Sequence, residues 1–317
     1  MDTESGQQEW LDGLSPAAEW DARATQRMLD ELFWFAHQYR SSKSFKALLK
    51  FIAGFRSYSP YNGLLVRTQM RGARFVAPAY RWSKKYGRTI KANARPLVIL
   101  QPMGPVMFVF DVSDTEAGPD AKPLPPEVER PFEPRRGRVG KELDHTVSNA
   151  VRDGIRVQAN KEGSQSGGSI RQVDSRKYTR LVFDAGKDKQ GRPKRVMVPL
   201  RYDILFNESS SKEARYATIA HELAHLYCGH LGTPNEKWWP DRRGLDLQIQ
   251  EFEAESAAFL VCARLGIDNP SETYLAEYFG QNPEVPNISI DAVTKSTGLI
   301  EQMGRGRMDP RPCKSEA

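Results

Sequence analysis

The segment Ala220–His230 reads AHELAHLYCGH, with two histidines four positions apart and a glutamate directly after the first. Residues four apart lie on one face of an α-helix, so the imidazoles of His221 and His225 can bind one metal ion. Glu222 is then placed to act as general base on a water molecule activated by zinc. This His-Glu-x-x-His spacing is typical of hydrolytic zinc sites and predicts Glu222 as the catalytic residue.

A catalytic zinc ion needs a third protein ligand. His230 lies five residues after His225, about 140° around a continuous helix, which is a poor direction for the same ion. We expect His230 to be either a contact for substrate or an oxyanion, or a histidine without a role in the chemistry. The metzincin spacing fails, because Cys228 and Leu231 stand where that class has glycine and histidine.

A second acidic motif supplies a better ligand. Glu251 and Glu255 are four apart in a segment with helical periodicity and share one face. We predict Glu251 as the third ligand and Glu255 as the partner that orients a ligand histidine, although a swap of these two roles stays open. Glu253 is expected to point toward solvent. The two histidines with these glutamates predict one Zn²⁺ per chain. The alternative is that the histidine pair occurs on the helix by chance and binds no metal.

Charge is distributed unevenly along the 317 residues, which carry a formal net charge of +6. The stretch 32–110 contains no Asp or Glu, which favours a polyanionic partner for this part of the chain. Cations follow phosphates, and aromatic faces stack on unpaired bases, so single-stranded nucleic acid is favoured over duplex. The simpler alternative to nucleic-acid binding is that the basic residues form a solvent-exposed face and the aromatic residues form the core beneath it. The predicted contacts are Tyr58, Tyr61, Arg67, Arg71, Arg74, Tyr80, Arg81, Trp82, Lys84, Lys85, Arg88 and Lys91.

Helical and strand-like patterns predict an α+β fold with two domains. We expect a small basic α+β domain that binds nucleic acid, and a metallopeptidase-type domain in which a small sheet supports metal-binding helices. The latter should contain long helices at 211–230 and 247–265. The expected boundaries are a disordered tail at 1–15, the basic domain at 16–116, a proline-rich linker at 117–139, the metal-binding domain at 140–303 and a tail at 304–317.

Two segments together resemble a known family. SPYNGLLVRTQMRGARFVAPAYRWSKKYGRTIKANARPLVILQP with VFDVSDTE resembles the N-terminal domain of ArdC-like antirestriction proteins. AHELAH with EFEAESAAFLVCARLGI resembles their C-terminal zinc metallopeptidase domain, which is similar to ImmA/IrrE-type peptidases of the gluzincin kind. The resemblance implies single-stranded DNA as a partner, a protein substrate, a mobile-element setting, and His221, His225, Glu251 and Glu222 as site residues. Gln250 replaces the acid that usually precedes the ligand glutamate.

Two functions from different classes remain open at this stage. One is a zinc peptidase associated with single-stranded DNA, and the other is a non-catalytic protein that coats DNA and carries a structural or idle zinc site. Glu222 favours the enzyme, because a structural zinc has no use for a general base. Three cysteines at wide spacing, the absence of a signal-like N-terminus and the absence of a long apolar run lead us to expect a cytoplasmic protein without a membrane partner.

Overall fold

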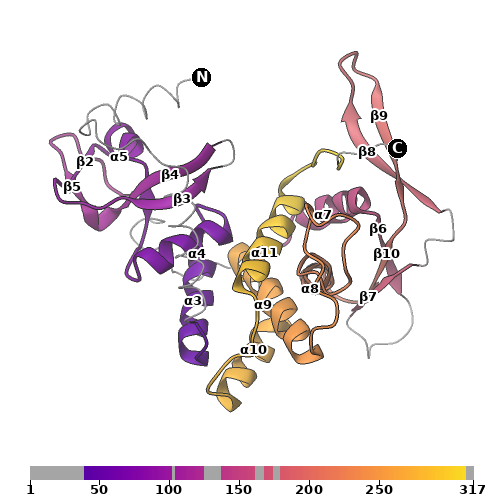
Figure 1. Cartoon of the computed structure of the whole chain (residues 1–317). Helices are drawn as coiled ribbons and strands as arrows, with labels where there is room; N and C mark the ends of the chain where they lie inside the picture. Colours follow the sequence, from indigo (N-terminus) through magenta and orange to yellow (C-terminus); the bar gives the residue numbers. More distant parts are fainter. Residues whose placement is uncertain (1–38, 102–103, 125–136, 161–167, 174–178, 312–317) are drawn as a thin grey trace. The chain divides into compact units, whose positions relative to one another are not determined.

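The computed structural model describes residues 39–101, 104–124, 137–160, 168–173 and 179–311 (Figure 1). Its contacts divide the chain into two compact units, one containing Lys50–Glu133 and the other containing Arg40–Leu49 with Pro134–Ala317. Both units combine helices with small sheets, so the expected α+β class is confirmed. The tail expected at 1–15 lies outside the described residues, as does most of the proline-rich linker.

The first unit combines two small antiparallel sheets with short helices. One sheet has the order β1-β4-β3, and the other pairs β2 with β5. Two amide side chains fasten α4 to β3: Asn62 exchanges two hydrogen bonds with the backbone of Leu100, and Gln69 does the same with Val98. The elements are α4 (Pro60–Gln69), β1 (Val76–Ala77), α5 (Ala79–Tyr86), β2 (Arg88–Ile90), β3 (Leu97–Gln101), β4 (Gly104–Asp111) and β5 (Thr115–Ala117).

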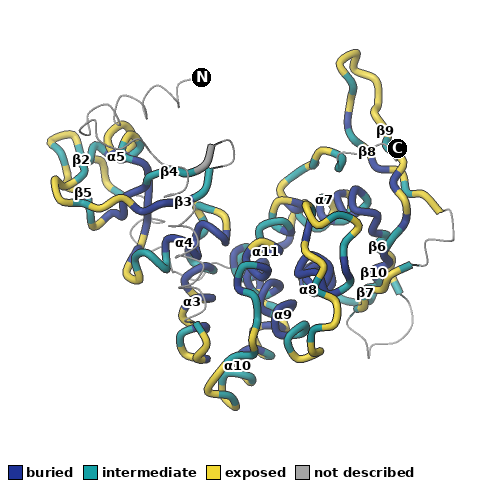
Figure 2. The backbone as a smooth tube through the Cα atoms, viewed as in Figure 1, coloured by how far each residue is buried: buried dark blue, intermediate teal, exposed yellow. Residues whose placement is uncertain are grey.

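The second unit packs helices beside a three-stranded sheet of order β6-β10-β7, in which β10 runs parallel to β6 and antiparallel to β7. A separate hairpin joins β8 to β9. Large parts of α8, α9 and α11 are buried (Figure 2). The elements are α7 (Glu142–Ala150), β6 (Ile155–Asn160), β7 (Gly168–Gln172), β8 (Arg180–Lys187), β9 (Pro193–Pro199), β10 (Tyr202–Asn207), α8 (Lys212–Tyr227), α9 (Leu247–Leu265), α10 (Pro270–Gln281) and α11 (Ile290–Arg305).

Helix α3 (Ser42–Gly54) is divided between the two units, with residues up to Leu49 in the second unit and residues from Lys50 in the first. Its first half belongs to the second unit, where Phe45 packs against Phe252 and Phe279 with ring centroids 5.6 and 6.3 Å apart. The sequence boundary at 16–116 places this half-helix with the basic domain. The helical periodicity of Phe45 is the same whether the residue packs into the core of the first unit or of the second, so the local sequence pattern does not show to which unit it belongs.

Helix α8 has defined signals at both ends. The Ser211 side chain accepts a hydrogen bond from the backbone N–H of Ala214, which caps the first turn. The helix ends at Tyr227 because Gly229 adopts φ +90°, and a Cβ there would lie 2.4 Å from the carbonyl oxygen of Pro240. The expected continuation of this helix to residue 230 is therefore wrong, and the turn at Gly229 redirects the chain.

Helix α9 packs against α8 and carries the second acidic motif. Ala220 and Ala224 on α8 are fully buried, as are Ala254 and Ala258 on α9, and small side chains allow two helices to approach closely. Gly266, with φ +80°, ends α9 in a left-handed cap. Among the described residues, no helix is both long and apolar enough to cross a membrane.

Candidate metal centre

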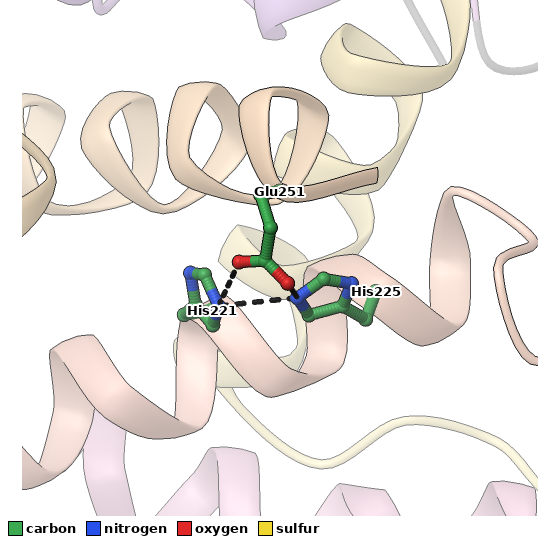
Figure 3. A group of neighbouring side chains, drawn as sticks. All are labelled: His221, His225 and Glu251. Atoms are coloured by element: carbon green, nitrogen blue, oxygen red, sulfur yellow. Dashed lines mark hydrogen bonds and ion pairs between the residues drawn. The ribbon is translucent and has the colours of Figure 1, made fainter. Parts of the chain in front are cut away.

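Helices α8 and α9 bring three candidate ligands together. The Nε2 atoms of His221 and His225 lie 3.1 Å apart. The Glu251 carboxylate approaches both rings, with Oε2 3.7 Å from His221 Nε2 and Oε1 3.5 Å from His225 Nε2. Figure 3 shows Glu251 extending from its helix toward the two imidazoles on the other. The structure thus groups two residues from one turn of α8 with a third that lies 26 positions beyond His225 in sequence.

The spacing of these donor atoms matches the size of a tetrahedral metal site. Zinc bonds to imidazole nitrogen and carboxylate oxygen at about 2.0–2.2 Å, so neighbouring ligand atoms in a tetrahedron lie about 3.3 Å apart. The Nε2–Nε2 distance of 3.1 Å and the distances of 3.5 and 3.7 Å to the two oxygens of the Glu251 carboxylate lie on either side of that value. The side chains of His221, His225 and Glu251 are 20%, 10% and 39% exposed, so the grouped atoms remain accessible. Two imidazoles and one carboxylate suit zinc and other divalent transition ions.

Glu222 lies next to this group and is 7% exposed. Burial raises the pKa of Glu222 to about 7, while the neighbouring His221 and the backbone N–H of Ile170 oppose the shift. A carboxyl group with a pKa near neutrality can both accept and return a proton at physiological pH. Its position on α8 and its environment therefore suit a general base.

Glu255 lies beside the other nitrogen of His221. Its Oε1 is 3.6 Å from His221 Nδ1, longer than a good hydrogen bond but within ion-pair distance. Burial lowers the pKa of His221, but Glu255 and the nearby Glu222 and Glu251 outweigh burial, so the pKa lies above its ordinary value. The Glu251 carboxylate approaches the Nε2 atoms of both histidines, whereas Glu255 approaches Nδ1 of His221.

The structure contradicts the expected exposure of Glu253 and one of the two alternatives for His230, the contact with substrate or an oxyanion. Glu253 does not face solvent: its side chain is fully buried and accepts two hydrogen bonds from the Arg242 guanidinium, at 2.6 and 2.7 Å. His230 is also buried, with Nε2 2.9 Å from Glu253 and Nδ1 3.0 Å from His225 Nδ1. Both ring nitrogens of His230 are therefore engaged, and neither is directed at substrate or an oxyanion. The turn at Gly229 makes helical extrapolation invalid for His230.

Cys228, His230 and Glu253 form a second cluster of potential metal ligands, all buried. The Arg242 guanidinium already contacts both oxygens of Glu253, and a fixed positive charge there disfavours a cation. Burial raises the pKa of the Cys228 thiol to about 12, whereas a metal needs the thiolate. This donor set does not fit a metal ion; His230 contacts His225 and Glu253, whereas the Cys228 thiol contacts the Ser296 hydroxyl.

Strand β7 is a part of the site that the sequence did not reveal. Gly168 begins this strand, and a Cβ at Gly168 would lie 2.3 Å from Thr218 Cγ2 on α8 and 3.4 Å from Glu222 Oε1. Only a residue without a side chain allows the strand to pass so close to α8. Among the described strands, β7 pairs with β10 alone and forms an edge of its sheet.

The residues predicted to bind nucleic acid separate by burial. Trp82 is fully buried and donates a hydrogen bond from Nε1 to the carbonyl oxygen of Phe110, and Tyr61 is 8% exposed. Neither can stack on a base, so their prediction as contacts is wrong, because composition alone does not distinguish a core aromatic residue from a surface one. The partly buried residues are Tyr58, Arg67, Arg81 and Arg88, and the exposed ones are Arg71, Arg74, Tyr80, Lys84, Lys85 and Lys91.

A comparison with protein families covers the metal centre. Residues 175–284 match the Peptidase_M78 family, described as the IrrE N-terminal-like domain. This part of the chain is similar to IrrE N-terminal-like domains. The ImmA/IrrE-type part of the expected resemblance is thereby confirmed, and the matched segment contains His221, Glu222, His225, Glu251 and Glu255.

Comparisons with individual proteins identify one similar structure and no similar curated protein. No curated protein matches the chain significantly. Among solved structures, the chain is similar to the Mn(II)-bound crystal structure of the antirestriction protein ArdC from plasmid R388. The two share 14% sequence identity over 82% of this chain and 93% of that chain, with a TM-score of 0.32.

Proposed function

We propose that this chain is a zinc-dependent peptidase with a basic unit that binds single-stranded DNA. One observation carries the enzymatic half: His221, His225 and Glu251 present donor atoms 3.1 to 3.7 Å apart beside the buried carboxyl group of Glu222. The three ligands leave a fourth tetrahedral position for water or substrate, which is the pattern of catalytic and not structural zinc sites. The IrrE N-terminal-like domain supports the peptidase class.

When bound, a zinc ion would act as a Lewis acid and lower the pKa of water in its open position. His221, His225 and Glu251 would hold the ion, and Glu222 would receive the proton released during attack on the peptide bond. Glu222 can then return that proton to the leaving amine. The edge of β7 beside Glu222 supports a peptide substrate, because an extended chain can add to an exposed sheet edge through backbone hydrogen bonds.

Metal content tests the ligand set. We expect one zinc ion per full-length chain, measured by elemental analysis after dialysis. Glu251→Gln should lower the affinity for zinc by at least about 100-fold, because loss of a ligand costs more than the 10- to 100-fold lost when an outer partner is removed. Peptide hydrolysis should disappear with a chelator and return when zinc is added.

Glu277→Gln is the matched control for this substitution. Glu277 lies on α10 in the same unit and is exposed, so the same change of carboxylate to amide should leave zinc content unchanged. Equal zinc binding by Glu251→Gln and the parent protein would contradict the ligand assignment. A chain that binds no divalent metal would overturn the proposed enzyme itself.

The charge distribution supports the DNA-binding half of the proposal. All 14 basic residues of the stretch 32–110 lie in a sequence without Asp or Glu. Exposed cations occur on α5 and on the turn before β1, at Lys84, Lys85, Arg71 and Arg74. Tyr80 is 36% exposed at the start of α5, where its ring can stack on an unpaired base. Tyr80 alone is exposed among the aromatic residues predicted as contacts, so we expect phosphate contacts, and not base stacking, to be the main source of affinity.

Removing two of these cations should weaken DNA binding in a salt-dependent way. In the full chain, the double substitution of Lys84→Ala and Lys85→Ala should lower the slope of log affinity against log salt by about one for each phosphate that is no longer neutralised. Lys237→Ala, an exposed cation in the second unit, is the control and should leave the slope unchanged. Fluorescence anisotropy with a single-stranded oligonucleotide measures both. Equal or tighter binding to duplex, or affinity independent of salt, would contradict the proposal.

The second candidate function is a DNA-coating protein whose metal site does no chemistry. The acid-free basic stretch favours it, since occupancy of DNA alone can block another enzyme. In either form, the sequence resemblance to ArdC-like proteins leads us to propose a role in antirestriction on a mobile element. The two candidates differ in whether Glu222 is needed.

A further inference from the structure

A chain of buried hydrogen bonds leads from Glu253 through His230 to His225. His230 Nε2 lies 2.9 Å from Glu253 Oε2, and His230 Nδ1 lies 3.0 Å from His225 Nδ1. The side chains of His230 and Glu253 are 1% and 0% exposed. No solvent reaches these two side chains, so each proton in the chain is held by one protein atom and accepted by another.

The direction of the first hydrogen bond follows from the other partners of Glu253. Arg242 donates to both carboxylate oxygens, and the backbone N–H of Ser289 donates to Oε1 at 2.6 Å. With His230, each oxygen then has two partners, which uses the full accepting capacity of an ionised carboxylate. Neither Arg242 nor a backbone N–H can accept a proton. Glu253 therefore accepts throughout, and His230 donates from Nε2.

The charge balance determines the second hydrogen bond. The partly exposed Arg242 guanidinium already balances the buried charge of Glu253, so a proton on both nitrogens of His230 would add an uncompensated positive charge on a side chain that is 1% exposed. His230 is therefore neutral, with its proton on Nε2 and a lone pair on Nδ1. His225 must then donate from Nδ1, and its Nε2 is left unprotonated on the side of His221 and Glu251.

We propose that His230 and Glu253 are positioning residues that hold His225 in the tautomer able to bind metal through Nε2. This inference rests on the proposed metal site. It adds a residue that orients His225, as the Glu255 contact orients His221. Arg242 keeps Glu253 charged, and the left-handed turn at Gly229 returns His230 to lie behind the ligand. A metal-binding imidazole whose other nitrogen donates to a fixed acceptor is both oriented and made more basic.

The tautomers can be read directly in the metal-free protein. The chain has five histidines, so long-range ¹H–¹⁵N correlation on full-length protein labelled at histidine gives five ring patterns. Single His→Gln substitutions assign them. We expect His225 to carry its proton on Nδ1 and His230 to carry its proton on Nε2. A proton on Nε2 of His225, or protons on both nitrogens of His230, would overturn the proposal without any change to the buried cluster.

Two substitutions separate positioning from packing. In His230→Asn, the amide oxygen can take the place of Nδ1 and accept from His225, whereas in His230→Gln the amide reaches instead toward Glu253. We expect Zn²⁺ affinity, measured by competition with a chromophoric chelator, to fall by about 10- to 100-fold in His230→Gln and by clearly less in His230→Asn. The Nδ1–H tautomer of His225 should persist in the Asn variant and become mixed in the Gln variant.

The outcomes distinguish this inference from the proposed function. Equal zinc affinity in the two variants would assign His230 a packing role and overturn the positioning role. A parent protein that binds no zinc would overturn the proposed function, while the His225 tautomer, which is read without metal, would still support or reject the hydrogen-bond chain. If a variant does not fold, the parent spectrum alone carries the test.

Discussion

Glu222→Gln is expected to lose peptide hydrolysis by at least about 100-fold while it still binds zinc and DNA. The amide has nearly the shape of the carboxyl group but cannot take the proton that hydrolysis releases. Glu222 lies on the inner side of α8 next to the donor atoms of His221 and His225, and is not one of the grouped ligands. The readout is cleavage of a peptide library, and of the chain itself with and without single-stranded DNA, at matched zinc content.

Glu236→Gln is the control for Glu222→Gln. Glu236 lies in the loop between α8 and α9 and is exposed, so its change to an amide should leave hydrolysis unaltered. If Glu222→Gln retains the activity of the parent, Glu222 is not the general base. The same variant also decides between the two candidate functions in cells. Protection of DNA equal to that by the parent would favour the DNA-coating protein, and loss of protection with normal DNA binding would favour the peptidase.

The residues of the metal centre that local spacing could predict are those on single turns of helix. His221 and His225 share a face at any position in a fold, and so do Glu251 and Glu255, because helical periodicity does not depend on the rest of the chain. The distances of 3.1 to 3.7 Å between donor atoms agree with that expectation. The packing of the two helices against each other could be expected because the two histidines on one helix need a third ligand, and Glu251 on the other helix can supply it.

The supporting residues could not be predicted in this way, because a turn places them. His230 leaves the helical path at Gly229, which has a left-handed backbone with φ +90° and no room for a Cβ beside the Pro240 carbonyl oxygen. Arg242 lies in the loop that follows the same turn. The backbone N–H of Arg242 donates a hydrogen bond to the carbonyl oxygen of Gly229, and this bond holds the loop where the Arg242 side chain can contact Glu253. Spacing along α9 showed only that Glu253 points away from Glu251, and pointing away was taken as exposure.

Burial in the basic unit shows the same limit for aromatic residues. Trp82 lies two positions after Tyr80 on a short helix, and the two point to opposite environments: Trp82 into the core with Phe75 and Phe110, Tyr80 to solvent. Their residue types alone suggest a shared aromatic platform. Strand β7 was missed for a different reason, since Gly168 and its polar neighbours lack the alternation of a half-buried strand.

Glu253→Ala is expected to destabilise the protein by about 3–5 kcal/mol, the cost of breaking a buried ion pair from one side. The substitution leaves the His230 Nε2–H without its acceptor in a region closed to water, and it leaves the Arg242 guanidinium, whose side chain is 21% exposed, without its ion-pair partner. Burial raises the pKa of Glu253, but hydrogen bonds from His230, Arg242 and Ser289 outweigh it, so the folded pKa lies below the ordinary value of 4.5. The stabilisation is therefore present above about pH 4.5 and is lost as the pH falls through the folded pKa.

Denaturant unfolding of metal-free protein at pH 7 measures this loss, and a double-mutant cycle identifies its cause. Arg242→Ala and Glu253→Ala should together cost less than the sum of the two single losses, because the second substitution removes the charge that the first left unpaired. Lys295→Ala, which breaks a surface pair with Asp291 in which the lysine side chain is 60% exposed, should cost less than about 1 kcal/mol. Additive losses in the cycle would mean that Glu253 stabilises the fold by packing alone. Non-additive losses would establish the pair as the charged support behind His230, on which the orientation of His225 depends.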